Sequence, residues 1–151
     1  MKKTVGILAM TACLAAFGAR ADDAKENEAM KMKMTFEDKT VVVTLADNGA
    51  AKQLAAMLPE TFEFIDFANQ EKIAEFKKPV SLAGAPRGMI ASKGKMFIYA
   101  PWGNLGFFYK NHGFTKDENL IELGEVQSGL EHLAAQKGGF TAHLELMTEE
   151  K

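Results

Sequence analysis

The residues best suited to binding chemistry gather around Trp102, the only tryptophan of the chain. It follows Pro101 and precedes Asn104 in a predicted turn, and the flanking segments are aromatic, with Tyr99, Phe107, Phe108 and Tyr109. Aromatic side chains with a few polar groups commonly line ligand pockets. Because large aromatic residues also fill protein cores, two interpretations stay open. The rings either form a groove for a peptide or small apolar ligand, or they pack inside the fold and at its rim.

Arg87 is the most notable polar candidate, because it is the only arginine after Arg20. It lies in the stretch 81–95, where glycine, proline and serine predict a long loop. Together with Asn104 it would supply the polar groups of a site around Trp102. Arg87 is also the one candidate for a catalytic role. The candidate ligand-binding residues are Phe62, Phe64, Arg87, Tyr99, Trp102, Asn104 and Phe108.

The sequence predicts neither a metal site nor a cofactor. His112, His132 and His143 have neither H-x-H nor H-x-x-x-H spacing, and the chain has a single cysteine; metal sites usually bring such residues together at short intervals. Within Met30–Met34 methionines alternate with lysines. This period of two is typical of a core-facing strand rather than of copper(I) ligands. Phosphate-binding loops, dinucleotide fingerprints and the nucleophile motif G-x-S-x-G are absent from the sequence.

Residues 1–21 have the pattern of a secretory signal peptide. Two lysines precede an uncharged apolar run over 5–17, and small residues end in Ala19-Arg20-Ala21. Cys13 would permit a lipoprotein, but the residue three positions before it is Met10, where that pattern prefers leucine. The favoured interpretation is therefore a cysteine in a discarded leader and export to the periplasm or the medium. The charged stretch 22–29 is a short linker.

Composition points to one globular domain over residues 30–147. The chain is 47% hydrophobic and 25% charged, which is the profile of an ordinary folded domain. Without Lys2, Lys3 and Arg20 the basic residues fall from 18 to 15 against 20 acidic ones, so the net charge is 15 − 20 = −5. An acidic domain without a basic cluster is a poor nucleic-acid binder. The apolar run near the start is too short for a membrane span, and we expect a monomer.

Hydrophobic periodicity predicts a mainly β protein. Alternating or β-branched runs predict eight strands, at 30–36, 40–45, 61–67, 72–76, 95–99, 105–109, 120–123 and 139–146. Two helices are expected, one from Asp47 to Pro59 and one from Ser128, as its cap, to 135. Short connections favour antiparallel pairing, and closure removes exposed edges. The prediction is a closed eight-stranded antiparallel barrel with two short capping helices.

Three stretches resemble the cyclophilin fold: Leu45–Leu54, Pro101–Tyr109 and Leu123–Leu133. Their order is that of a cyclophilin, and the last is similar to the F-G-x-V-x-x-G-M-x-V segment before the second helix. The segment Tyr99–Tyr109 resembles the Y-x-P-W-G-N-x-x-x-F-Y pattern of short bacterial cyclophilin-like proteins, whose biochemical role is unsettled. The resemblance implies the cyclophilin-like barrel.

The resemblance also raises prolyl isomerisation as an activity. Cyclophilins use an arginine in an F-H-R motif, whereas the counterpart here is Phe62-Glu63-Phe64. The glutamine before their paired phenylalanines is replaced by Gly106. The first hypothesis is therefore a module that binds a peptide or small molecule without efficient catalysis. The alternatives are a weak peptidyl-prolyl isomerase that uses Arg87, and a structural or interaction domain with no pocket.

Overall fold

The computed structural model describes residues 28–148. The predicted signal peptide, 1–21, Cys13 and most of the predicted linker lie outside these residues. The described part forms a closed barrel in the order β1-β10-β3-β4-β7-β6-β9-β2, with every neighbouring pair antiparallel. The predicted eight-stranded barrel with two short helices is confirmed.

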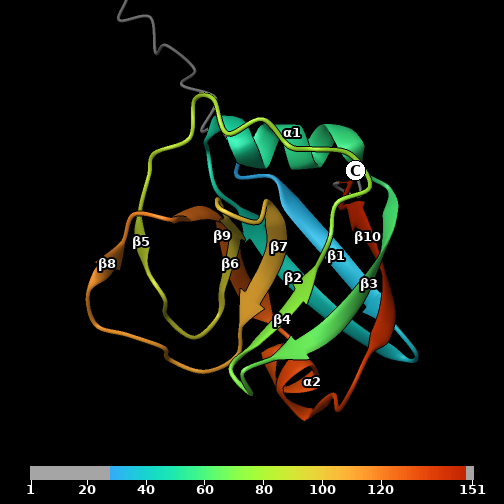
Figure 1. Ribbon diagram of the computed structural model, residues 1–151. Helices are drawn as coiled ribbons and strands as arrows, with labels where there is room; N and C mark the ends of the chain where they lie inside the picture. The colour runs from blue at the N-terminus through green and yellow to red at the C-terminus, as the bar shows by residue number, and fades with distance from the viewer. Residues whose placement is uncertain (1–27, 149–151) are drawn as a thin grey trace, which may run out of the picture.

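Seven of the eight strands agree with the predicted runs within two residues at each end, whereas the run 120–123 continues to Ser128. Figure 1 shows the strands wrapped into a barrel with a helix near each end. The barrel strands and helices are β1 (Lys31–Phe36), β2 (Lys39–Leu45), α1 (Gly49–Met57), β3 (Glu60–Phe67), β4 (Glu71–Ala74), β6 (Lys95–Tyr99), β7 (Asn104–Phe108), β9 (Leu120–Ser128), α2 (Leu130–Ala135) and β10 (Phe140–Leu146).

Alternation along the strands places one set of side chains inside the barrel. Met32 and Met34 of β1 are fully buried, as are Val41 and Val43 of the neighbouring β2. Successive side chains of a strand point to opposite faces, so the intervening lysines of β1 point outward. Met32 and Met34 thus belong to the core, as their period predicted, whereas Met30 precedes β1 and is 37% exposed.

The two helices begin in different ways. Asn48 caps α1, because its side-chain oxygen accepts a hydrogen bond from the backbone N–H of Ala51 at 2.9 Å. The predicted cap of α2 is wrong: Ser128 is the last residue of β9, and the N-cap is Gly129. Gly129 has a φ of +86°, and a Cβ there would collide with the carbonyl of Thr40. The close approach of β2 therefore requires glycine and moves the helix start by one residue.

A second, smaller layer lies outside the barrel. After β4 the chain first passes along α1 and packs on the barrel core. It then pairs with the segment 109–119 through β5 (Met89–Ile90) and β8 (Lys116–Asp117), seen at the left of Figure 1. Sequence analysis predicted loops there, because two-residue strands leave no periodicity. Beneath them lies a small outer core, made up of Met89, Ala91, Phe97, Phe108 and Leu120.

Gly106 lies beneath this outer core, and its missing side chain leaves room for the ring of Phe97. The ring of Phe97 lies over it, in the space that a Cβ would occupy, and stacks on Phe108 with ring centroids 4.2 Å apart. The group that approaches Gly106 so closely is the ring of Phe97, from the adjacent strand β6.

We expect Gly106→Ala to destabilise the domain by about 1–3 kcal/mol, because overpacking forces Phe97 off its position. Urea unfolding of the mature domain measures the change. Gly113→Ala is the matched control, since nothing lies within 4 Å of the added Cβ. Equal midpoints for the two variants would contradict this account of the outer core.

Candidate functional site

Trp102 is held at the surface by the turn between β6 and β7. The backbone N–H groups of Trp102 and Gly103 both donate to the carbonyl of Tyr99, at 3.2 and 2.7 Å. The indole is 63% exposed, yet it makes edge contacts with the ring of Phe67 at 5.6 Å and that of Tyr99 at 5.3 Å. The indole of Trp102 is therefore largely exposed to solvent while it packs against the rings of Phe67 and Tyr99.

Three hollows meet at Trp102 and Asn104, which line all of them. Their volumes are about 370, 310 and 790 Å³, at the lower and middle part of the range of roughly 300–1,000 Å³ for small-molecule sites. We call them the first, second and third hollows in this order.

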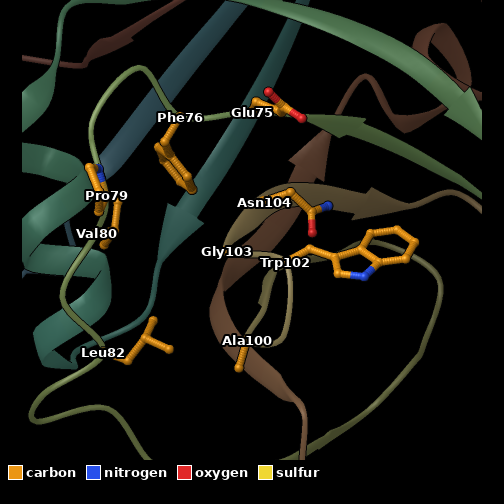
Figure 2. A pocket seen from close by; sticks show the side chains of 9 residues that line it. All are labelled: Glu75, Phe76, Pro79, Val80, Leu82, Ala100, Trp102, Gly103 and Asn104. Atoms are coloured by element: carbon orange, nitrogen blue, oxygen red, sulfur yellow. The ribbon is translucent and has the colours of Figure 1, made fainter.

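The first hollow lies between the barrel and the segment after β4. Figure 2 shows Phe76, Pro79 and Val80 on one side of it and Trp102 and Asn104 on the other. Its lining combines apolar side chains with the polar groups of Glu75 and Asn104.

The second and third hollows lie on the outer face of the sheet. They share Phe67, Ile73, Trp102 and Asn104, so they adjoin along β4. The other residues of the second hollow are Glu71, Phe97, Tyr99, Phe108, His112, Asp117 and Leu120. The other residues of the third hollow are Thr61, Phe62, Glu63, Ile65, Ala74, Glu75, Lys77 and Thr141.

Asn104 is the buried polar side chain of this surface. It is 6% exposed, and its carbonyl Oδ1 has no hydrogen-bond partner within the described residues. Its Nδ2 makes one long contact, 3.4 Å, with the carbonyl of Leu105. An unsatisfied buried acceptor costs about 1–3 kcal/mol. An N–H donor that reached Oδ1 would remove this cost.

Glu71 carries the most unusual carboxyl group of the site. In the strand register it lies between Phe67 and Phe108, and no lysine, arginine or histidine among residues 28–148 forms an ion pair with it. Burial against this apolar wall, helped by the negative charge of Asp66, raises the pKa of Glu71 to about 7. The carboxyl is therefore poised between its charged and neutral forms at neutral pH.

A buried lysine anchors the strands that carry the site. Lys72 points into the barrel and donates to Asp66 Oδ1 at 2.7 Å and to the carbonyl of Gln136. The hydroxyl of Tyr109 donates to the same carboxylate at 2.6 Å. Burial opposes ionisation of Asp66, but the hydrogen bonds from Lys72 and Tyr109 outweigh it and lower the pKa of that carboxyl. Burial and the same carboxylate raise the pKa of Tyr109 to about 12.

The structure brings four of the sequence candidates together. Tyr99, Trp102, Asn104 and Phe108 all line the second hollow. Phe62 lines the third hollow, although its side chain is 2% exposed and belongs to the barrel core.

Two other candidates lie apart from the hollows around Trp102. Phe64 packs in the barrel core, stacked on Phe140 with centroids 5.3 Å apart, and lines none of the three. Arg87 also lines none of them, and its Nε donates to the carbonyl of Glu118 at 3.1 Å.

Sequence reasoning did not single out Phe67 and Glu71. The run 61–67 contained a clue, because Phe67 breaks the alternation of Phe62 and Phe64 and must face the other side of β3. Glu71 carried no comparable signal. Phe67 is four residues away, but the rest of its surroundings come from β7 and the outer layer, which are distant in sequence.

Within residues 28–148 no three His, Cys, Asp or Glu side chains are close enough to hold a metal ion. His112 stacks on Phe108 at 6.2 Å between ring centroids, and His132 and His143 lie elsewhere, on α2 and β10. No helix in the described part of the chain has the length and apolar character that crossing a membrane requires.

Comparison with known proteins agrees with the barrel. The model of the cyclophilin-like family matches residues 34–145, so the chain belongs to that family. The fold is similar to the solution structure of the hypothetical protein AF2241 from Archaeoglobus fulgidus, with a TM-score of 0.62 and 14% identity over 78% of this chain and 94% of that one. At this identity the likeness concerns the fold alone. No curated protein sequence matches the chain.

The raised pKa of Glu71 predicts a specific pH dependence of stability. A carboxyl group whose pKa is about 7 when folded, against 4.5 as its ordinary value, binds more protons in the native state. The contribution of Glu71 to the free energy of unfolding is therefore fully present below pH 4.5 and is lost as the pH rises towards 7. The full shift sets an upper limit of about 3 kcal/mol, and partial solvent exposure reduces the expected loss to about 1–2 kcal/mol.

We expect Glu71→Gln to be more stable than the wild type at pH 8 and equal to it, or slightly less stable, at pH 4.5. Urea unfolding at both pH values measures this difference. Glu131→Gln, an exposed change on α2, should follow the wild type at both. A Glu71→Gln variant that gains nothing at pH 8 would show that Glu71 is not destabilised by ionisation.

Proposed function

We propose that this cyclophilin-like domain is a binding module for a peptide or small molecule, with its site at the three hollows around Trp102. The observation that carries the proposal is the pairing of a 63% exposed indole with the buried, unpartnered carbonyl of Asn104. Exposing the indole forgoes the free energy of burying a large apolar side chain. Leaving the amide oxygen unpaired has a further cost. A bound ligand would recover both.

An extended peptide suits the shape of the surface. The second and third hollows adjoin along β4, and Trp102 stands beside both. Ile65 and Phe67 continue the apolar surface and are 55% and 37% exposed. A backbone N–H of the ligand could donate to Asn104 Oδ1, while its side chains occupy the hollows on either side. A compact molecule would fill a single hollow and still contact the indole.

The chemistry of the walls supports binding without efficient catalysis. Prolyl isomerisation has a barrier of about 18–20 kcal/mol, and cyclophilins lower it with a cationic donor near the prolyl nitrogen. Arg87 makes its hydrogen bond with Glu118 away from the hollows. Among the described residues that line the hollows, Lys77 is the one lysine or arginine, and it pairs with Glu60 at 2.5 Å.

Export belongs to the same proposal. The leader pattern of residues 1–21 supports it, and the mature chain would begin near Asp22. The domain would then meet its ligand in the periplasm or the medium, as a monomer.

Peptide and small-molecule libraries screened by tryptophan fluorescence test the binding proposal, because Trp102 is the sole indole. For each ligand found, calorimetry should show that Trp102→Ala and Asn104→Ala weaken binding about tenfold or more. The matched control is Phe114→Ala, an aromatic side chain that is 93% exposed away from the hollows. If a ligand binds Trp102→Ala as tightly as wild type, its binding site lies elsewhere on the domain. If no compound changes the fluorescence, the structural or interaction domain without a pocket is favoured.

An isomerisation assay on a proline-containing peptide tests the catalytic alternative. We expect the rate to stay within about twofold of the uncatalysed rate, because Lys77, the one lysine or arginine among the described lining residues, is paired with Glu60. The variant Arg87→Ala should give the same rate. Clear acceleration by wild type that Arg87→Ala abolishes would establish the weak isomerase instead.

A further inference from the structure

The hollows around Trp102 carry an excess of negative charge. Glu63, Glu71, Glu75 and Asp117 line them, and none of the four forms an ion pair within residues 28–148. The one cation of the lining, Lys77, is already paired with Glu60. Carboxylates that converge on a cleft focus negative potential there and attract cations.

The second hollow adds aromatic walls to this charge. Glu71 lies between Phe67 and Phe108 in the strand register, and Tyr99 and Trp102 line the same cavity of about 310 Å³. The faces of aromatic rings attract organic cations, most strongly when the cation is removed from water. A carboxylate beside several rings is thus suited to an ammonium or guanidinium group and unsuited to an anion.

Asn104 is an independent indication of the same ligand. Asn104 lines the second hollow, its side chain is buried, and its Oδ1 has no hydrogen-bond partner among the described residues. An ammonium group has three N–H donors and a guanidinium has five. One such group can donate to a carboxylate and to an amide oxygen at once, whereas a purely apolar ligand would leave both acceptors unsatisfied.

We propose that the second hollow selects ligands that carry a primary ammonium or guanidinium group, with Glu71 and Asn104 as its acceptors and Trp102 and Tyr99 as its walls. This inference rests on the proposed binding function and names its ligand class. The cation is either the side chain of lysine or arginine in a peptide or the head of a free alkylamine. The chemistry at the site is the same for both.

Cation binding at Glu71 would be linked to proton release. The other titratable groups that line the second hollow are Tyr99, His112 and Asp117. Asp66 also acts on Glu71, and it is paired with Lys72 and accepts a hydrogen bond from Tyr109. Because burial raises the pKa of Glu71 to about 7, the group is about half protonated at pH 7 without a ligand. A bound cation lowers that pKa, so about half a proton should leave with each cation bound at pH 7.

The experiment compares peptides that differ only in one central side chain, in the mature domain. Acetylated and amidated hexapeptides carry lysine, arginine, Nε-acetyl-lysine or glutamate, and n-butylammonium represents the free amine. Calorimetry at pH 7 in two buffers of different ionisation enthalpy gives affinity and proton release together. The proteins are wild type, Glu71→Gln, Trp102→Ala and the matched control Glu131→Gln, with thermal unfolding of each to confirm folding.

We expect the lysine and arginine peptides to bind wild type at least tenfold more tightly than the acetyl-lysine peptide, with release of about half a proton. Glu71→Gln should reduce this preference to less than about threefold and abolish the release, while Glu131→Gln retains both. If n-butylammonium binds about as tightly as the lysine peptide, a free amine is enough for recognition. If it binds much more weakly, the ligand is a peptide that carries the cation on a side chain.

Other outcomes separate this inference from the function on which it rests. Neutral or acidic peptides that bind as tightly as the lysine peptide, and that lose affinity in Trp102→Ala, would overturn the cation preference and leave the binding module standing. A lysine preference that persists in Glu71→Gln would also overturn the inference. If no probe binds and the wider fluorescence screen is silent, both proposals fail.

Discussion

Closure of the barrel is the constraint on which the rest of the structure depends. Once eight strands pair in a ring, each residue has either an inner or an outer position. The side chains at the inner positions of β6 and β7 belong to the barrel core; they are Met96, Ile98, Leu105 and Phe107. The apolar residues on the outer positions of the same strands therefore need a separate cover.

That cover is the outer layer, and the hollows arise at its edge. The β5–β8 excursion buries Phe97 and Phe108, but Trp102 in the neighbouring turn stays 63% exposed, so part of the apolar surface is open. On the inner side, the cluster of Lys72, Asp66 and Tyr109 ties β3 and β4 to the chain after α2. The strands beneath the hollows are thus held from within, while the acceptors Asn104 and Glu71 face outward without partners of their own.

Sequence patterns predicted the strands well, because alternation records which face of each strand is buried. Phe62 and Phe64 fall in the predicted run 61–67 and share the inner face of β3. The same patterns were silent on β5 and β8, which are too short to show a period, and they misplaced the cap of α2 by one residue. A cap of α1 could be predicted from the sequence, because the hydrogen bond of Asn48 joins residues close along the chain. The glycine at the start of α2 could not, because the contact that requires Gly129 comes from β2.

The barrel and its family could thus be inferred from the chain alone, since both rest on local order along it. Which side chains share the hollows became clear only from the folded arrangement. It set Arg87 against Glu118 and Phe64 in the core, and it enclosed Glu71 between rings from two other strands. The reason is physical: burial, ion pairing and the pKa of a carboxyl group depend on neighbours in space, and in a β-barrel most of those neighbours are far away in sequence.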